Sequence, residues 1–259
     1  MQVAQKLAAG FPRTHATTLD VTSEVDLDEH IAAHDVVISL IPYIYHAAVI
    51  KSAIKSGTNV VTTSYVSDTI PELHDAAKKA GITVLNEVGV DPGVDHLYAI
   101  KKIDEVHAKG GKILEFYSYC GGLPAPECAD NLLGFKFSWS PRGALLSQRS
   151  SARFLKDGQV EEISSDALMA TAVPYHVMDG YDFVAYPNRD SVPFQRFYDI
   201  PEAHTFILGS LRYKGNPAFV QTLANLGWLD QEKKVWLKDG MTWAEIHQRA
   251  LGATNSNEK

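Results

Sequence analysis

Short apolar runs alternate with helical stretches in the first third of the chain, and this alternation constrains the fold more than any other feature. Three β-branched runs, DVVISL at 35–40, NVVTT at 59–63 and ITVLNE at 82–87, are typical of buried strands. The stretches between them, 45–57 and 70–81, each end at a glycine that suits a left-handed helix cap. Such short connections predict a parallel, doubly wound sheet with helices on both faces.

A weaker unit precedes this alternation. The run HATTLDV at 15–21 predicts one more strand, and SEVDLDEHIAAH at 23–34 predicts a helix with Ser23 or Asp26 as its N-cap. The opening segment 1–10 reads as a helix, and no G-x-G-x-x-G turn for a pyrophosphate is found in the chain. We therefore expect a partial Rossmann domain, whose missing central strand would leave an open apolar edge that favours aggregation.

The pattern changes after Gly93, where the spacing of apolar residues at 94–110 predicts an amphipathic helix. Further strands and turns are predicted at 112–120, 135–143, 158–164, 181–187 and 204–215, and helices at 217–227 and 241–251. We predict an α/β chain with two domains: a partial dinucleotide-binding domain at 1–93, and an α+β substrate-binding domain with a mixed sheet at 94–259.

Charge and composition argue against several classes of partner. The net charge of −7 leaves no basic excess for a phosphate backbone or an anionic bilayer, so neither nucleic acid nor membrane is expected as a partner. No window approaches the ~18 consecutive apolar residues of a membrane span. The spacing of Cys120 and Cys128 matches neither a zinc site nor a redox pair, which favours a reducing, cytoplasmic location.

Several longer motifs together resemble the saccharopine dehydrogenase family, of the NADP-dependent, glutamate-forming type found in fungal lysine biosynthesis. The resemblance rests on DVVISLIPYIYHAAVIKSAI, VVTTSYVS, NEVGVDPGVDHLYAIKKIDEVH, SYCGGLPAPECADNLLGFKFSWSPRG, VAYPNRDS and GSLRYKGNP. It covers nearly the whole chain. Because the family pattern also contains a glycine-rich nucleotide loop before these motifs and a further portion after them, the resemblance predicts a partial chain.

The resemblance implies an oxidoreductase that joins glutamate and 2-aminoadipate 6-semialdehyde as an imine, which NADPH reduces to saccharopine. NADP(H) is the implied cofactor, and these small molecules are the implied partners. Saccharopine carries several carboxylates, and the planar guanidinium fork suits such groups. Arg189 and Arg212 match substrate-contacting positions of the family, although an ordinary surface charge or salt bridge is the plainer alternative.

The resemblance also implies the other members of the site. The implied substrate-binding residues are Ser64, Tyr65, Asp91, Cys120, Gly122, Leu123, Arg189, Ser210, Leu211 and Arg212. The implied cofactor-binding residues are Ser39, Leu40, Ile41, Thr63, Val88, Gly89, Val90 and Trp139. Asp91 is the candidate catalytic residue, because its carboxylate could hold a substrate ammonium or the imine nitrogen.

Each of these assignments competes with a structural alternative. Serines and threonines after strands are often turn or N-cap residues, and Asp91 could form an Asx turn ahead of Pro92. Cys120 could be a small buried hydrophobe, and a tryptophan such as Trp139 is usually a core residue. His46, Asp91 and His96 fit no metal-site spacing, so no metal is predicted.

Two hypotheses from different classes follow. The first is the NADPH-dependent oxidoreductase, with the segment 86–127 as the floor of a shared active site: 88–91 would face the nicotinamide and 120–123 the substrate. The second is a truncated, catalytically inactive member that binds a small anionic ligand or a partner. The oligomeric state does not follow from the residues, and a homodimer stays open.

Overall fold

The computed structural model describes residues 2–253, and the chain divides into two compact units, Met1–Lys101 and Lys102–Lys259. The division falls inside helix α5 (Val94–His107). The predicted boundary after residue 93 therefore stays a prediction. Residue 1 and residues 254–259, which belong to the two predicted domains, lie outside the described part.

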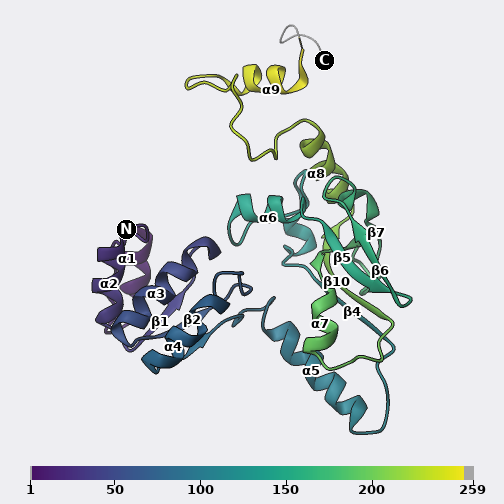
Figure 1. Ribbon diagram of the computed structural model, residues 1–259. Helices are drawn as coiled ribbons and strands as arrows, with labels where there is room; N and C mark the ends of the chain where they lie inside the picture. The colour runs from purple at the N-terminus through teal and green to yellow at the C-terminus, as the bar shows by residue number, and fades with distance from the viewer. Residues whose placement is uncertain (1, 254–259) are drawn as a thin grey trace. The chain divides into compact units, whose positions relative to one another are not determined.

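A parallel three-stranded sheet forms the centre of the first unit (Figure 1). Its strands follow in the order β1 (Val36–Ser39), β2 (Asn59–Thr62) and β3 (Val84–Leu85), and both pairings are parallel. The predicted parallel α/β sheet is thus confirmed. Because all three strands point the same way, their carboxyl ends meet at one edge of the sheet.

The helices of the first unit begin and end where the sequence predicts. Gly57 and Gly81 end α3 and α4 in the left-handed conformation, which costs glycine little. Ser23 is the N-cap of α2, because its hydroxyl accepts the backbone N–H of Asp26. The helical elements are α1 (Gln2–Ala8), α2 (Glu24–Ala32), η1 (Tyr43–Tyr45), α3 (His46–Ser56), η2 (Pro71–Leu73) and α4 (His74–Ala80).

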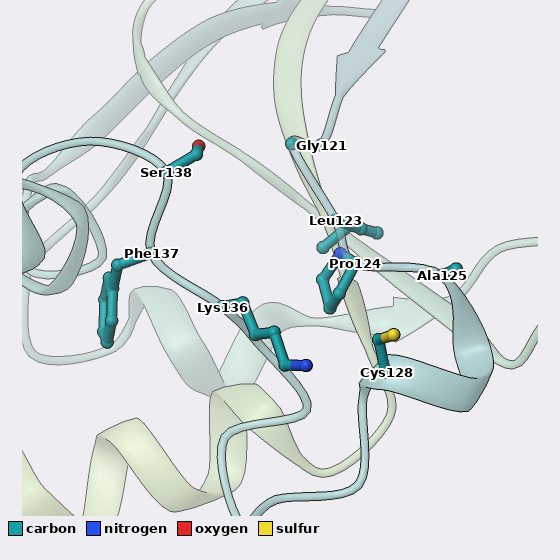
Figure 2. A pocket seen from close by; sticks show the side chains of 9 residues that line it. Gly121, Leu123, Pro124, Ala125, Cys128, Lys136, Phe137 and Ser138 are labelled. Atoms are coloured by element: carbon teal, nitrogen blue, oxygen red, sulfur yellow. The ribbon is translucent and has the colours of Figure 1, made fainter. Parts of the chain in front are cut away.

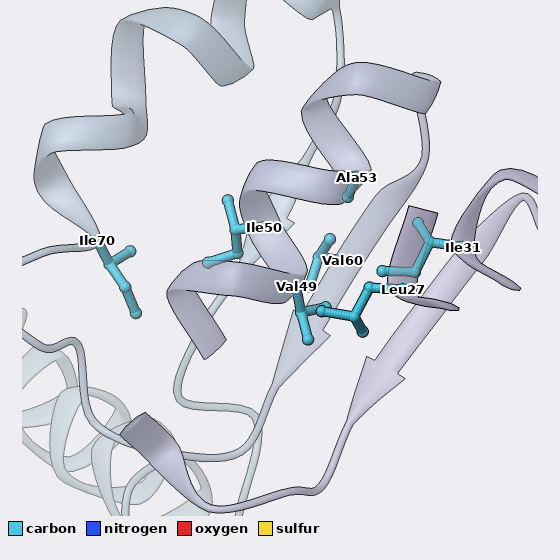
Figure 3. Packing of buried hydrophobic residues seen from close by; sticks show 7 residues of the cluster. All are labelled: Leu27, Ile31, Val49, Ile50, Ala53, Val60 and Ile70. Atoms are coloured by element: carbon cyan, nitrogen blue, oxygen red, sulfur yellow. The ribbon is translucent and has the colours of Figure 1, made fainter. Parts of the chain in front are cut away.

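Helices cover one face of this sheet. The core of buried side chains comes from α2, α3, β2 and the start of the segment before α4, and Figure 3 shows how they interdigitate: Leu27, Ile31, Val49, Ile50, Ala53, Val60 and Ile70. Each fully buried aliphatic side chain contributes roughly 1.5–3 kcal/mol. On the opposite face Val36, Ile38 and Leu85 are 49%, 64% and 53% exposed. The prediction of helices on both faces is therefore wrong for the described residues.

The run 15–21 is not a strand, which corrects the prediction made from its β-branched residues. A strand needs a hydrogen-bonded neighbour, and β1 pairs only with β2 among the described strands. Strand-like composition is therefore not enough here, and 15–21 is an irregular segment that leads into α2. Ile38 lies on the exposed face of β1, and the exposed Leu40 follows the strand, whereas the expected aggregation at an open edge stays a prediction.

A mixed seven-stranded sheet forms the second unit, as the sequence predicts. Its longest strand, β10, pairs with β4 in parallel and with β5 and β8 in antiparallel orientation. The remaining strands extend the sheet in the order β6-β5-β10-β8-β7, with β9 parallel to β5. The strands are β4 (Glu115–Cys120), β5 (Ala152–Lys156), β6 (Gln159–Ile163), β7 (Val173–Pro174), β8 (Phe183–Pro187), β9 (Arg189–Asp190) and β10 (Thr205–Tyr213).

The second unit also contains short helices, and several of them contact the sheet. They are η3 (Pro126–Cys128), α6 (Pro141–Ser147), η4 (Leu168–Thr171), α7 (Val192–Phe197), α8 (Asn216–Asn225) and α9 (Trp243–Leu251). One core cluster joins Leu168 of η4 and Val220 of α8 to Tyr186 of β8. On β10, the ring of Phe206 stacks on that of Phe116 at 4.7 Å between centroids. β10 is therefore the strand against which most of the unit is built.

The segment 135–143, predicted as part of the strands and turns, contains no strand. Asn131 binds the backbone at both ends of a turn, donating to the carbonyl of Phe135 and accepting from the N–H of Leu133. Ser140 then caps α6 by accepting the Gly143 N–H at 3.1 Å, and Pro141 occupies the first turn of that helix. The hydrogen bonds of the turn and of the helix cap thus determine the conformation of this segment, whereas its alternating aromatic residues do not. Strand β5 and helix α7 were not predicted at all.

Candidate active-site residues

The polar residues predicted in the first unit gather at the carboxyl edge of its sheet. Ser39 is the last residue of β1 and is buried, whereas the next residue, Leu40, is exposed. Ile41 packs against the hydrophobic core. Thr63 follows β2 directly, and the backbone N–H of Val88 donates to the carbonyl of Thr62 at 3.0 Å. The segment after β3 is therefore tied to the end of β2.

A glycine turn at 89–93 holds this edge together. The Gly89 N–H donates to the carbonyl of Pro92 at 2.9 Å, and the N–H of Val94 returns to the carbonyl of Gly89 at 3.0 Å. A β-carbon added at Gly89 would lie 3.0 Å from the Thr63 carbonyl oxygen. At Gly93, where φ is 145°, it would lie 2.2 Å from the Gly89 carbonyl oxygen. Only glycine fits these close backbone approaches.

The turn brings Asp91 to Tyr65. The Tyr65 hydroxyl donates to the Asp91 carboxylate at 2.5 Å, although the residues are separated by 26 positions. Next to them, the Glu87 carboxylate accepts the backbone N–H of Val66 at 3.1 Å and so fixes the loop that carries Tyr65. Three of the predicted residues thus lie in the two segments at this edge: Ser64 and Tyr65 after β2, and Asp91 after β3. Val90 lies in the same turn and is 73% exposed.

His46 is a member of this edge that the sequence analysis missed. Its Nδ1 lies 2.9 Å from the Ser39 hydroxyl, and its Nε2 lies 3.0 Å from the Ser64 hydroxyl. The side chain is buried, and burial lowers the pKa of His46 below its usual value. A serine that ends a strand and a histidine that begins the next helix were the signal in the sequence.

In the second unit, the sheet places several predicted residues in register. Ser210 of β10 lies opposite Cys120 of β4 and opposite Tyr186 of β8. The Asn188 side chain donates to the Ser210 hydroxyl at 2.9 Å. Leu211 follows, and Gly121 approaches it so closely that an added β-carbon would lie 2.9 Å from the Leu211 carbonyl oxygen. Cys120, Ser210 and Leu211 therefore belong to one region.

Arg212 is a buried cation in the same strand. Its residue is 8% exposed, and its guanidinium carbon lies 5.3 Å from the centroid of the Phe135 ring. Nη1 donates to the Leu211 carbonyl at 2.7 Å, while Nε is buried without a hydrogen-bond partner among residues 2–253. Within the same residues no carboxylate forms an ion pair with it. A buried guanidinium left in this state is suited to bind an anionic ligand group.

The second predicted arginine, Arg189, lies in the short strand β9 opposite Ala152 and is exposed. Its φ is 48°, which is uncommon for a residue other than glycine. Such conformations are concentrated at ligand-binding and catalytic positions. The backbone of Arg189 therefore agrees with a functional role, and the substrate contact itself stays a prediction.

A cavity of about 580 Å³ lies beside these strands, within the size range of small-molecule sites. It is lined by two loops of the second unit: Gly121, Gly122, Leu123, Pro124, Ala125, Cys128, Lys136, Phe137 and Ser138. The predicted residues Gly122 and Leu123 belong to it, whereas Lys136 and Cys128 were not predicted. Figure 2 shows the Lys136 side chain extending toward Cys128, which gives the cavity a cationic group.

Trp139 does not line this cavity. Its side chain is exposed and lies against the first turn of α6, where an added β-carbon on Gly143 would meet the ring at 2.7 Å. The alternative that Trp139 is a core residue does not hold, because the residue is 56% exposed. Its predicted contact with the cofactor stays a prediction.

The fold and these residues define a class: an α/β unit of the dinucleotide-binding type joined to an α+β unit with a cavity and a buried arginine. Family models agree with this division. The saccharopine dehydrogenase NADP binding domain matches residues 2–85, and the saccharopine dehydrogenase C-terminal domain matches residues 89–256. The chain belongs to the saccharopine dehydrogenase family.

Similar proteins agree over almost the whole chain. Saccharopine dehydrogenase [NADP(+), L-glutamate-forming] of Pyricularia oryzae is 54% identical over 259 residues, which are 100% of this chain and 58% of that protein. The Saccharomyces cerevisiae protein of the same name is 54% identical over 94% of this chain and 55% of its own length. The chain thus spans somewhat more than half the length of these relatives.

A solved structure supports the fold. Apo histidine-tagged saccharopine dehydrogenase (L-Glu forming) from Saccharomyces cerevisiae superimposes with a TM-score of 0.83 and is 54% identical. The match covers 97% of this chain and 56% of that one. At this identity the shared fold extends to the strands and loops that carry the candidate residues.

Proposed function

We propose that the protein containing this chain is an NADP-dependent oxidoreductase of lysine biosynthesis that interconverts saccharopine with glutamate and 2-aminoadipate 6-semialdehyde. The observation that carries the proposal is Arg212, a buried guanidinium without an acidic partner in residues 2–253. A ligand rich in carboxylates supplies the missing partner. The names of relatives that are 54% identical support this choice of ligand.

The carboxyl edge of the first sheet would hold the nicotinamide end of NADP(H). The close approaches at Gly89 and Gly93 bring backbone groups to the surface of the edge, and Leu40 and Val90 expose apolar side chains beside them. These features fit a flat ring with an amide group. The bound cofactor supplies or accepts the hydride. Ser39, Ile41, Thr63 and Val88 complete the proposed contacts at this edge.

Asp91 would handle the proton at the substrate nitrogen. Its carboxylate accepts the Tyr65 hydroxyl at 2.5 Å, so the pair holds one proton between two oxygen atoms. A carboxylate fixed in this way can pair with an ammonium or iminium nitrogen, and Tyr65 keeps it oriented. Asp91 is therefore our candidate catalytic residue, and Ser64 and Tyr65 are its neighbours toward the substrate.

The inactive alternative has no observation in its favour. The absence of nucleic-acid and membrane partners and a cytoplasmic location remain predictions from the sequence, and a homodimer stays open. Within residues 2–253, no helix has both the length and the apolar character needed to cross a bilayer.

The first prediction is the activity itself. The purified protein is expected to reduce NADP when saccharopine is added and to oxidise NADPH with glutamate and the semialdehyde, followed by NADPH absorbance. This chain should be compared with a version extended to the full length of its relatives, because it spans 58% of the Pyricularia oryzae protein. Protein that binds NADPH but turns over no saccharopine would contradict the proposal. Equal activity of the two versions would contradict the predicted partial nucleotide domain.

A second prediction concerns Arg189. Arg189→Ala should raise the KM for saccharopine about tenfold or more while changing the KM for NADP little, because the proposed role of its guanidinium is to bind a substrate carboxylate. Arg196→Ala is the control, since this exposed arginine of α7 is not among the candidate residues. Unchanged saccharopine kinetics in Arg189→Ala would remove Arg189 from the site.

A further inference from the structure

His46 connects two strand ends that the proposed function assigns to different ligands. Ser39, at the end of β1, belongs to the proposed cofactor contacts, and Ser64, after β2, belongs to the proposed substrate contacts. The imidazole lies between them, with Nδ1 at 2.9 Å from the Ser39 hydroxyl and Nε2 at 3.0 Å from the Ser64 hydroxyl. His46 is 1% exposed, so water cannot replace either contact.

The buried position of the ring favours the neutral imidazole. Burial lowers the pKa of His46, and the ring belongs to the first residue of α3, where the helix dipole also disfavours a cation. A neutral imidazole has one N–H donor and one acceptor nitrogen. The two contacts must therefore differ in direction: one serine hydroxyl donates to the ring and the other accepts from it.

The surroundings of Ser39 determine which group donates in its hydrogen bond with His46. Ser39 is 4% exposed, and His46 is the only hydrogen-bond partner of its hydroxyl among residues 2–253. If Nδ1 carried the proton, the Ser39 hydroxyl would accept it and its own hydrogen would be buried without an acceptor, which is costly. With the proton on Nε2, Ser39 donates to Nδ1 and both buried groups are satisfied. The Ser64 oxygen then accepts from Nε2.

We propose that His46 is a positioning residue whose Nε2–H tautomer orients the Ser64 hydroxyl as a hydrogen-bond donor toward an oxygen of the substrate. The inference rests on the proposed function, because Ser64 is one of its substrate contacts. Since the Ser64 oxygen already accepts from His46, its hydrogen is left for a ligand acceptor such as a carboxylate. A donor fixed before binding costs less ordering entropy when the ligand arrives.

The tautomer can be measured directly in the full natural protein. Long-range ¹H–¹⁵N correlation spectra of histidine-labelled protein are expected to show Nδ1 of His46 unprotonated and Nε2 protonated. His46→Gln identifies the signal by its loss. His74→Gln, at the exposed first residue of α4, should leave the His46 signal unchanged. A proton on Nδ1 would overturn the proposal, whatever the enzyme does.

Two amide variants separate a positioning role from mere packing. The amide nitrogen introduced by His46→Gln would lie near the Nε2 position and keep a donor to Ser64, whereas the shorter amide of His46→Asn lies near Nδ1 and does not reach Ser64. We expect His46→Asn to raise the KM for saccharopine about tenfold and His46→Gln to stay within about threefold of the wild type. The kcat and the KM for NADP should change less in both variants.

Equal effects of the two amide variants, or none in either, would overturn the positioning role. If a variant fails to fold, which thermal denaturation reports, the tautomer in the wild type decides. A wild-type protein that binds no saccharopine in titration calorimetry would overturn the proposed function and the ligand assigned to Ser64. The spectra would still report the tautomer of His46 between Ser39 and Ser64. A failure of the tautomer proposal can therefore be distinguished from a failure of the proposed function.

Discussion

Gly93→Ala is expected to destabilise the first unit by about 3–5 kcal/mol and to remove most of the activity, because the turn at 89–93 has no room for a side chain. An added β-carbon would lie 2.2 Å from the Gly89 carbonyl oxygen and 2.7 Å from that of Glu87. The φ of 145° is also one that alanine adopts only with strain. Relief requires the turn to open, which would move Asp91 away from Tyr65.

Gly81→Ala is the matched control for this substitution. Gly81 also has a positive φ, at 72°, but an added β-carbon there meets nothing within 4 Å. It should therefore cost only about 1 kcal/mol, the usual penalty of the left-handed region. Urea denaturation and kcat/KM for saccharopine are measured for both variants. Similar losses in both would mean that backbone conformation matters and the close approach to Gly89 does not.

Local signals in the sequence predict the helices of the first unit well. Strands are predicted less well, because they depend on pairing with residues far away in the chain. The helices that end at Gly57 and Gly81 follow from capping residues a few positions away, so the sequence contains all that decides them. The run 15–21 has strand composition, but a strand also requires a neighbour from elsewhere in the chain. At 135–143, contacts of Asn131 and the cap at Ser140 override the alternating pattern.

The candidate site shows the same limit. Family resemblance selects Tyr65 and Asp91, but their 2.5 Å contact depends on the glycine turn that follows β3 and on the hydrogen bond from Val88 to the end of β2. A serine at a strand end and a histidine at the start of the next helix are visible in the sequence, but they do not reveal that both nitrogens of His46 contact serines from two strand ends. Similarly, neither the burial of Arg212 nor the presence of Lys136 in the cavity can be read from neighbouring residues.

Replacing Arg212 is expected to change stability and activity in opposite directions. A buried guanidinium whose Nε has no hydrogen-bond partner among residues 2–253 is costly to the protein without ligand, since its lost hydration is only partly replaced. Methionine has a similar length and no charge, so Arg212→Met is expected to leave the melting temperature unchanged or raised. A buried charge that loses its partner typically costs about 2–5 kcal/mol in binding, so the KM for saccharopine should rise roughly 30-fold to 4,000-fold.

The measurement pairs thermal denaturation without ligand with steady-state kinetics for saccharopine and NADP. The KM for NADP should stay within about threefold of the wild type, because the candidate cofactor contacts of the first unit are unaltered. Arg196→Met controls for the loss of one positive charge from an exposed position. If Arg212→Met instead lowered the melting temperature and both KM values rose together, Arg212 would be a structural residue. A stable Arg212→Met variant with a selective loss of saccharopine binding would identify the Arg212 guanidinium as a binding site for a substrate carboxylate. The fold would then keep this buried cation although it lowers the stability of the protein.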